Sequence, residues 1–390
     1  MAPTNPLFAI LITAVAFLSV WLINKNKPPM TEKGRFDSID GLRGYLAFFV
    51  FLHHSDVNYV FVTTGEWTRT ASNLYTVFGF GSVQVFFMIT AFLFFSKLLN
   101  SNTSKMDWPK FFVGRLLRLY PLYLFSLSLI LLVIIYLSRG NLYESYWELF
   151  KHITSWLLMG VFGNANINEL KLTSQINAGV TWSLAYEWMF YLAMPIFAFL
   201  LRKKSTIFWL LFSLIGVALI SSFNPLLGAK DFIGGILAAY LIRNEKFSVF
   251  ATSKLASFIV TLCLVVVVFL NITGNEDITL TLLAVAFILI ACGNNLYGAL
   301  AHSTSKALGD LSYSIYLLHG ILLFVIFNIV LDKSFITSPN TYWAIIALIT
   351  PILIFACHFT YHYIEYPAMR STNYTMDWLK KLSRRNVQKA

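Results

Sequence analysis

The chain has 390 residues, of which 57% are hydrophobic and 12% are charged, and its formal net charge is +11. Soluble globular domains carry about 25% charged residues, so this composition argues against a soluble protein. The positive charge requires no nucleic-acid partner, because basic loops beside an anionic membrane surface account for it. We therefore expect an all-α, polytopic membrane protein that has membrane lipids as partners and binds no nucleic acid.

Apolar runs recur along most of the chain, and most are long enough to cross about 30 Å of hydrocarbon. They predict about eleven spans, at residues 7–23, 44–62, 78–99, 119–137, 180–201, 206–222, 229–243, 255–272, 277–292, 310–331 and 342–364. The first run has neither the charge nor the cleavage site of a signal peptide, which favours an anchor helix. The run at 152–163 is too short to span comfortably and is predicted to be interfacial or re-entrant.

The basic residues predict the orientation. If the spans alternate as predicted, 23 of the 29 Lys and Arg residues fall on one side of the membrane and 6 on the other. Basic loops mark the cytoplasmic side. We expect a multi-pass protein of the cell (inner) membrane, with its C-terminus in the cytoplasm and its N-terminus outside.

The segment from Ile39 to Asp56 combines an arginine at the start of an apolar run with a histidine further inside it. Arg43 and His54 are eleven positions apart, which places them about 20° apart on a helix surface and about 16 Å apart along its axis. Titratable groups at membrane depth are costly and usually mark a functional site. This helix face is the first candidate site.

A second basic pair stands at the start of a later span. Arg115 and Arg118 are three positions apart and share a helix face. One interpretation is anchoring of the helix at the cytoplasmic surface. The other is a fork for phosphate or carboxylate, since guanidinium groups match those oxygens in geometry and charge.

A carboxylate and a polar stripe extend the candidate site. Glu187 lies one to two turns inside an apolar segment, where it either pairs structurally, orients a catalytic histidine or holds a substrate hydroxyl. Tyr316 and His319 share a helix face with Ser312 and either hold helices together or line a substrate path. The histidines and cysteines lack ligand-like spacing, so no metal site is predicted.

Taken together and in this order, these segments resemble the membrane-bound acyltransferase-3 family, which includes bacterial polysaccharide O-acetyltransferases. The resemblance covers about residues 35–370, and residues 1–34 would add one transmembrane helix and a basic linker to a core of ten spans. Residues 371–390 would form a basic cytoplasmic tail. The chain has Ser82 and Thr90-Ala91 where many relatives have glycine and a Ser-Gly pair, which puts the local helix packing there in doubt.

The resemblance implies roles for individual residues. His54 would be required for acyl transfer with Arg43 as its companion, and Arg43, Arg115 and Arg118 would bind the phosphates of acyl-CoA. Trp182 falls on the family's tryptophan–glutamate pair together with Glu187. We expect Glu187 to act with His54, and Trp182, Tyr316 and His319 to bind the acceptor.

The function predicted on this basis is O-acyl transfer, and most simply O-acetyl transfer. The donor is cytoplasmic acetyl-CoA or another acyl-CoA, with no permanently bound cofactor, and the acceptor is a hydroxyl of an outward-facing cell-surface or lipid-linked glycan. His54 either deprotonates that hydroxyl or carries the acyl group transiently. The alternative class is a proton-coupled transporter of a lipid-linked sugar or organic anion. The sequence is silent on the sugar, the acyl length and the oligomeric state.

Overall fold

The computed structural model describes residues 2–25, 36–69, 71–100, 106–201, 207–223, 226–270 and 276–387. Every regular element in these ranges is helical, which confirms the all-α prediction. Residues 26–35, the basic linker expected after the first span, lie outside the described ranges, as do residues 271 and 272 at the end of another predicted span.

In the part of the chain that the structure describes, ten helices form the body of the protein. They are α1 (Pro6–Asn24), α2 (Asp37–Thr64), α4 (Ser82–Asn100), α5 (Trp108–Leu137), α8 (Trp182–Leu200), α9 (Ile207–Phe223), α12 (Lys254–Leu270), α13 (Glu276–Ala291), α15 (Ser312–Val325) and α16 (Pro339–Thr360).

The other α-helices are α3 (Asn73–Thr76), α6 (Tyr146–Leu157), α7 (Thr173–Ile176), α10 (Ile233–Leu241), α11 (Glu245–Ala251), α14 (Ser303–Asp310), α17 (Tyr366–Arg370) and the C-terminal α18 (Thr372–Val387). Three π-helical turns interrupt the long helices, at η1 (Val77–Gly81), η4 (Ile326–Val330) and η6 (Tyr361–Glu365). Three 3₁₀ turns complete the described elements, at η2 (Ile167–Glu169), η3 (Leu226–Phe232) and η5 (Lys333–Phe335).

Within the described ranges, six helical segments are long and apolar enough to cross a membrane: 6–24, 73–100, 108–137, 182–200, 312–330 and 339–370. The pair α11 and α12, bent by 67°, makes a seventh if it is counted as one span. The chain is therefore a multi-pass membrane protein, although the predicted number of eleven spans is not confirmed. Helix α2 is not among the six because its histidines, Asp56 and Asn58 lower its hydropathy.

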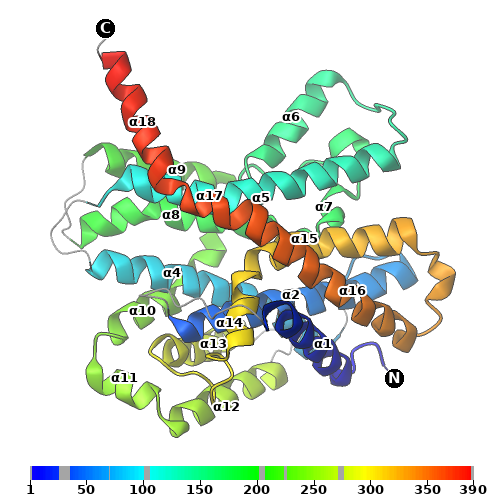
Figure 1. The fold of residues 1–390 in the computed structure, drawn as a ribbon, viewed down its shortest axis with the longest axis horizontal. Helices are drawn as coiled ribbons and strands as arrows, with labels where there is room; N and C mark the ends of the chain where they lie inside the picture. Colours follow the sequence, from blue (N-terminus) through cyan, green and yellow to red (C-terminus); the bar gives the residue numbers. More distant parts are fainter. Residues whose placement is uncertain are drawn as a thin grey trace.

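Helix α2 lies in the middle of the bundle (Figure 1), where it packs against α4, α14, α15 and η1. On one side, α5 packs against α15 and against the C-terminal helices α17 and α18. On another, α4 packs against α10 and α13, and α1 lies along α16. This central position explains the polar sequence of α2, because its polar groups face protein and not lipid.

Glycines bring α2 and α14 into backbone contact. A Cβ atom on Gly309 would lie 1.9 Å from the carbonyl oxygen of Asp40, and one on Gly44 would lie 2.6 Å from the backbone nitrogen of Gly309. Only glycine leaves room for such an approach. The contact holds the first turns of α2, which carry Arg43, beside the end of α14.

Helix α5 begins eleven residues before the predicted start of its span at 119. Asp107 caps it by accepting a hydrogen bond from the backbone of Lys110 (3.0 Å), and Pro109 stands in its first turn. The hydropathy pattern missed this part because its face toward the bundle is basic. Arg115 and Arg118 consequently lie two to three turns inside a helix. The predicted interfacial piece at 152–163 overlaps helix α6, which ends at Leu157.

Candidate functional site

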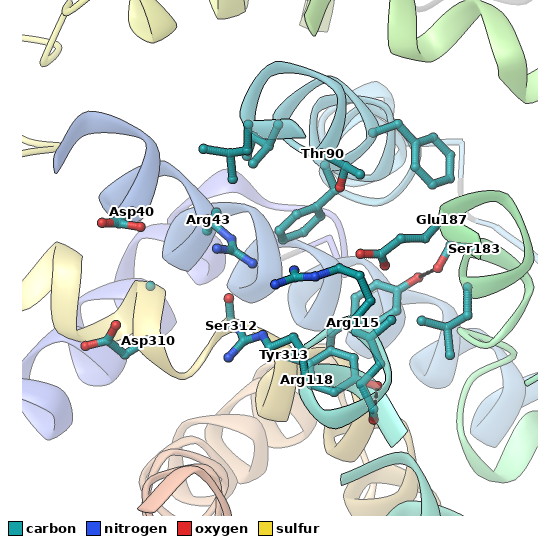
Figure 2. Close-up of a pocket in the computed structure, with 18 of the residues that line it drawn as sticks. Asp40, Arg43, Thr90, Arg115, Arg118, Ser183, Glu187, Asp310, Ser312 and Tyr313 are labelled. Atoms are coloured by element: carbon teal, nitrogen blue, oxygen red, sulfur yellow. Dashed lines mark hydrogen bonds between the residues drawn. The ribbon is translucent and has the colours of Figure 1, made fainter. Parts of the chain in front are cut away.

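A cavity of about 340 Å³ lies inside the bundle, between residues of α2, α4, α5, α8, α14 and α15 and of the segment from η6 to α17. Figure 2 shows its polar wall. Polar side chains in the lining are Asp40, Arg43, Thr90, Arg115, Arg118, Ser183, Glu187, Asp310, Ser312 and the tyrosines 191, 313, 316, 361 and 366. Residues from the separate sequence motifs thus share one cavity.

Arg43 and Arg115 present positive charge to this cavity without a close counter-ion. Within the described residues, neither has a carboxylate oxygen within 4.0 Å, and the Nε atom of Arg43 is buried without a hydrogen-bond partner. The guanidinium of Arg115 lies 4.8 Å from the ring centre of Phe94. Both arginines are half-buried, and cations withdrawn from water without a counter-ion are costly, so this wall is suited to an anionic ligand.

Arg118, the third arginine, is held by a carboxylate that the sequence analysis did not select. Its Nη1 atom lies 3.6 Å from Oε2 of Glu365, which is completely buried, and 2.8 Å from the sulfur of Met369. Ser314 donates a hydrogen bond to the other carboxylate oxygen of Glu365. Glu365 directly follows the last predicted span, which ends at residue 364, and an acidic residue beside a long apolar run was the available signal, because such residues are rare at membrane depth without a partner.

Glu187 stands in the second turn of α8 and faces the arginines across the cavity (Figure 2). Tyr191, one turn further along α8, donates a hydrogen bond to its Oε1 atom. The predicted position inside the apolar segment is therefore correct, and the carboxylate shares the cavity with Arg43 and Arg115. It does not contact a histidine within hydrogen-bonding distance.

Hydroxyl groups also line the cavity. Tyr316 of α15 lines it, and its hydroxyl lies 2.7 Å from Oγ of Ser183 and 3.0 Å from the carbonyl oxygen of Val180. Tyr316 therefore both lines the cavity and joins α15 to the start of α8. This contact supports the interpretation that the polar stripe holds helices together, and lining of a substrate path stays a prediction.

The histidines form a second cluster that does not line the cavity. Nδ1 of His54 lies 3.0 Å from Nε2 of His319, and the ring centre of His319 lies 6.4 Å from that of Tyr316. His53 packs against His54 with ring centres 4.9 Å apart, and its Nδ1 donates to the carbonyl oxygen of Tyr75 at 2.8 Å. Tyr316 thus separates the arginine cavity from the histidine cluster.

Two other expectations from the sequence concern Trp182 and metal binding. Trp182 is the first residue of α8, is 43% exposed, and contacts Phe87 and Tyr186 through ring edges; it does not line the cavity. In the described part of the chain, no three His, Cys, Asp or Glu side chains are arranged to hold a metal ion.

Comparison with known proteins adds one finding. The family model of an acyltransferase domain, that of the acyltransferase-3 family, matches residues 36–361. This range contains every residue that lines the arginine cavity except Tyr366 and Met369, and it ends just before Glu365. No curated protein and no solved structure has significant similarity to the chain.

Proposed function

Because the chain belongs to the acyltransferase-3 family, we propose that it is a membrane O-acyltransferase that takes the acyl group, most simply acetyl, from acyl-CoA. The observation that carries this proposal is the pair Arg43 and Arg115, which line the cavity and have no carboxylate partner within 4.0 Å among the residues that the structure describes. Anionic ligands satisfy such groups, and arginine binds phosphate in a bidentate manner.

The donor would enter from the side of the arginines. Coenzyme A carries a diphosphate and a further phosphate, which Arg43, Arg115 and Arg118 can neutralise. Arg118 lies 3.6 Å from the buried carboxylate of Glu365, so the charge of one of the three groups is already partly balanced before a ligand binds. The thioester arm would then extend along α2 toward His54, past Tyr316.

The acceptor would be a hydroxyl group of a glycan that approaches from the histidine side. A hydroxyl is a weak nucleophile at neutral pH, so a base is needed and histidine suits the task. In one route, His54 removes the hydroxyl proton as the oxygen attacks the thioester carbonyl, and the C–S bond breaks. In the other, His54 itself carries the acyl group before the hydroxyl attacks.

The proposed orientation follows the basic residues. The arginine end of α2 would face the cytoplasm, where acyl-CoA is made, and the histidines and Trp182 would lie toward the outside. The acyl-CoA donor would then lie on the cytoplasmic side and the glycan acceptor on the outer side, as transfer across the cell membrane requires.

The direct test is transfer by the purified protein in nanodiscs, with isotopically labelled acetyl-CoA and a glycan extract, measured by mass spectrometry. We expect ester-linked label on the glycan from the wild type and none from His54→Ala. The control is Lys246→Gln, an exposed residue on α11, which should transfer label like the wild type. In a parallel preparation of the purified protein in sealed vesicles, uptake of substrate without ester formation would instead support a transporter.

A further inference from the structure

The contact between His54 and His319 joins residues 265 positions apart in the chain. His319 is completely buried on α15, and its ring stacks against that of His54 with centres 5.0 Å apart. His54 is half-buried on α2. The pair therefore joins two central helices, α2 and α15. Tyr316 lies between this pair and the arginines.

The backbone partners determine which nitrogens carry protons. Nδ1 of His319 lies 2.7 Å from the carbonyl oxygen of Ile315, and Nδ1 of His54 lies 3.1 Å from that of Val50. A carbonyl oxygen only accepts, so each neutral ring is protonated on Nδ1. Nε2 of His319 then holds a lone pair 3.0 Å from the Nδ1–H group of His54.

This arrangement leaves Nε2 of His54 as its unprotonated nitrogen. We propose that His319 is a positioning residue that holds His54 in the Nδ1-protonated tautomer, so that Nε2 of His54 is the reacting atom. The inference rests on the proposed acyl transfer. Both nitrogens of His319 are engaged within the bundle, which leaves it no group to bind an acceptor.

In the reaction, His319 would orient the ring of His54 and would not itself transfer a proton. As the acceptor oxygen attacks the thioester carbonyl, its proton moves to Nε2 of His54 and the C–S bond breaks. The imidazolium formed keeps its Nδ1–H bond to Nε2 of His319, which stabilises the positive charge. The proton on Nε2 of His54 then passes to the departing thiolate, and both histidines return to their starting state.

The first test reads the tautomer without any reaction. Protein with ¹⁵N-labelled histidine in lipid bilayers is measured by solid-state NMR at mildly alkaline pH, and the His54 signals are assigned by their loss in His54→Gln. We expect the neutral ring to be protonated on Nδ1. A ring protonated on Nε2 would overturn the inference, whether or not the protein transfers acyl groups.

The second test separates positioning from simple support of the fold. The leucine of His319→Leu fills the space of the ring but offers no hydrogen-bond acceptor to His54. The amide of His319→Gln, in contrast, can place an oxygen near the position of Nε2. We expect His319→Leu to lower kcat about 100-fold with little change in KM for acyl-CoA, and His319→Gln to recover most of this loss. Equal losses in both variants would contradict the inference.

The matched control for these substitutions is His302→Asn. His302 caps α14 by accepting a hydrogen bond from Thr304, and asparagine is also a favoured cap, so this change should leave kcat unaltered. A wild type that transfers no acyl group would reject the proposed function itself, while the NMR result would still report on the histidine pair.

Discussion

The three arginines of the cavity differ in how their charges are balanced. Arg118 lies beside the buried Glu365, whereas Arg43 and Arg115 have no carboxylate at that range in the described chain. A ligand anion therefore gains most from Arg43 and Arg115. Spacing in the sequence predicted the Arg115–Arg118 face, but it could not assign Glu365, which is 247 positions beyond Arg118 and approaches it only through tertiary packing.

This difference predicts a separation of kinetic effects. Arg43→Gln and Arg115→Gln should each raise KM for acyl-CoA by about 10- to 100-fold, because a hydrogen bond between charged groups contributes about 1.5–3 kcal/mol. His54→Ala should lower kcat instead. Initial rates at varied acyl-CoA concentrations measure both. A normal KM in both arginine variants would contradict anion binding in this cavity.

At the scale of elements, backbone contacts and irregular turns position the site. Gly309 lets α14 contact α2 next to Arg43, and the π-helical turn η1 places Gly79 against the ring of His53. The periodicity of the sequence predicted the helix that carries Arg43 and His54. It could not predict π-helical turns, because these differ from an α-helix by one inserted residue and depend on neighbouring packing.

Gly309→Ala tests the contact between α2 and α14. The added Cβ would lie 1.9 Å from the carbonyl oxygen of Asp40, so the helices must separate and Arg43 must move. We expect a lower thermal unfolding temperature in detergent and a higher KM for acyl-CoA. Gly114→Ala is the control, since its Cβ would make an ordinary contact of 3.6 Å with Thr372. Equal stability of the two variants would contradict the close approach.

Helix α1 lies outside the residues that match the family, yet it packs on the element that supports His53. Phe8 stacks on Trp343 with ring centres 5.4 Å apart, and the hydroxyl of Tyr75 donates to the carbonyl oxygen of Asn5 at 3.3 Å. The carbonyl of Tyr75 in turn accepts from His53. Helix α1 therefore packs against the residues that support the histidine cluster.

The role of α1 predicts unequal effects of two substitutions on this helix. Phe8→Ala removes a buried ring and should destabilise the protein by about 3 kcal/mol, whereas Leu11→Ala alters a side chain that is 61% exposed on the same helix. Thermal unfolding of the two variants in nanodiscs measures the difference. A Leu11→Ala variant that is as unstable as Phe8→Ala would show that α1 does not pack as described.

At the scale of the whole molecule, the bundle places two clusters along its central helix. The arginine cavity and the histidine cluster are carried by opposite parts of α2 and are separated by Tyr316. A transferase with its donor and acceptor on different sides of a membrane requires such a separation. The proposed orientation of α2 in the membrane follows from the distribution of the basic residues, and a separate experiment tests it.

Cysteine labelling tests the orientation. The natural cysteines, Cys263, Cys292 and Cys357, are buried, so their background reaction with a membrane-impermeant maleimide should be low. In intact cells we expect labelling of Thr4→Cys and of Asn141→Cys, which follows α5. Lys246→Cys, on α11, should react only after the membrane is permeabilised. Labelling of Lys246→Cys in intact cells would contradict the proposed orientation.

The sequence by itself determined that this is a helical membrane protein with titratable groups at depth, because composition and helical periodicity are local properties of the chain. It also placed Arg43 and His54 on one face of one helix. Only the tertiary structure decided that Arg43 and Arg115 share a cavity without a nearby carboxylate, that Glu365 holds Arg118, and that His319 meets His54 beyond Tyr316. Those contacts join residues far apart in the chain, and helix packing alone determines which side chains meet.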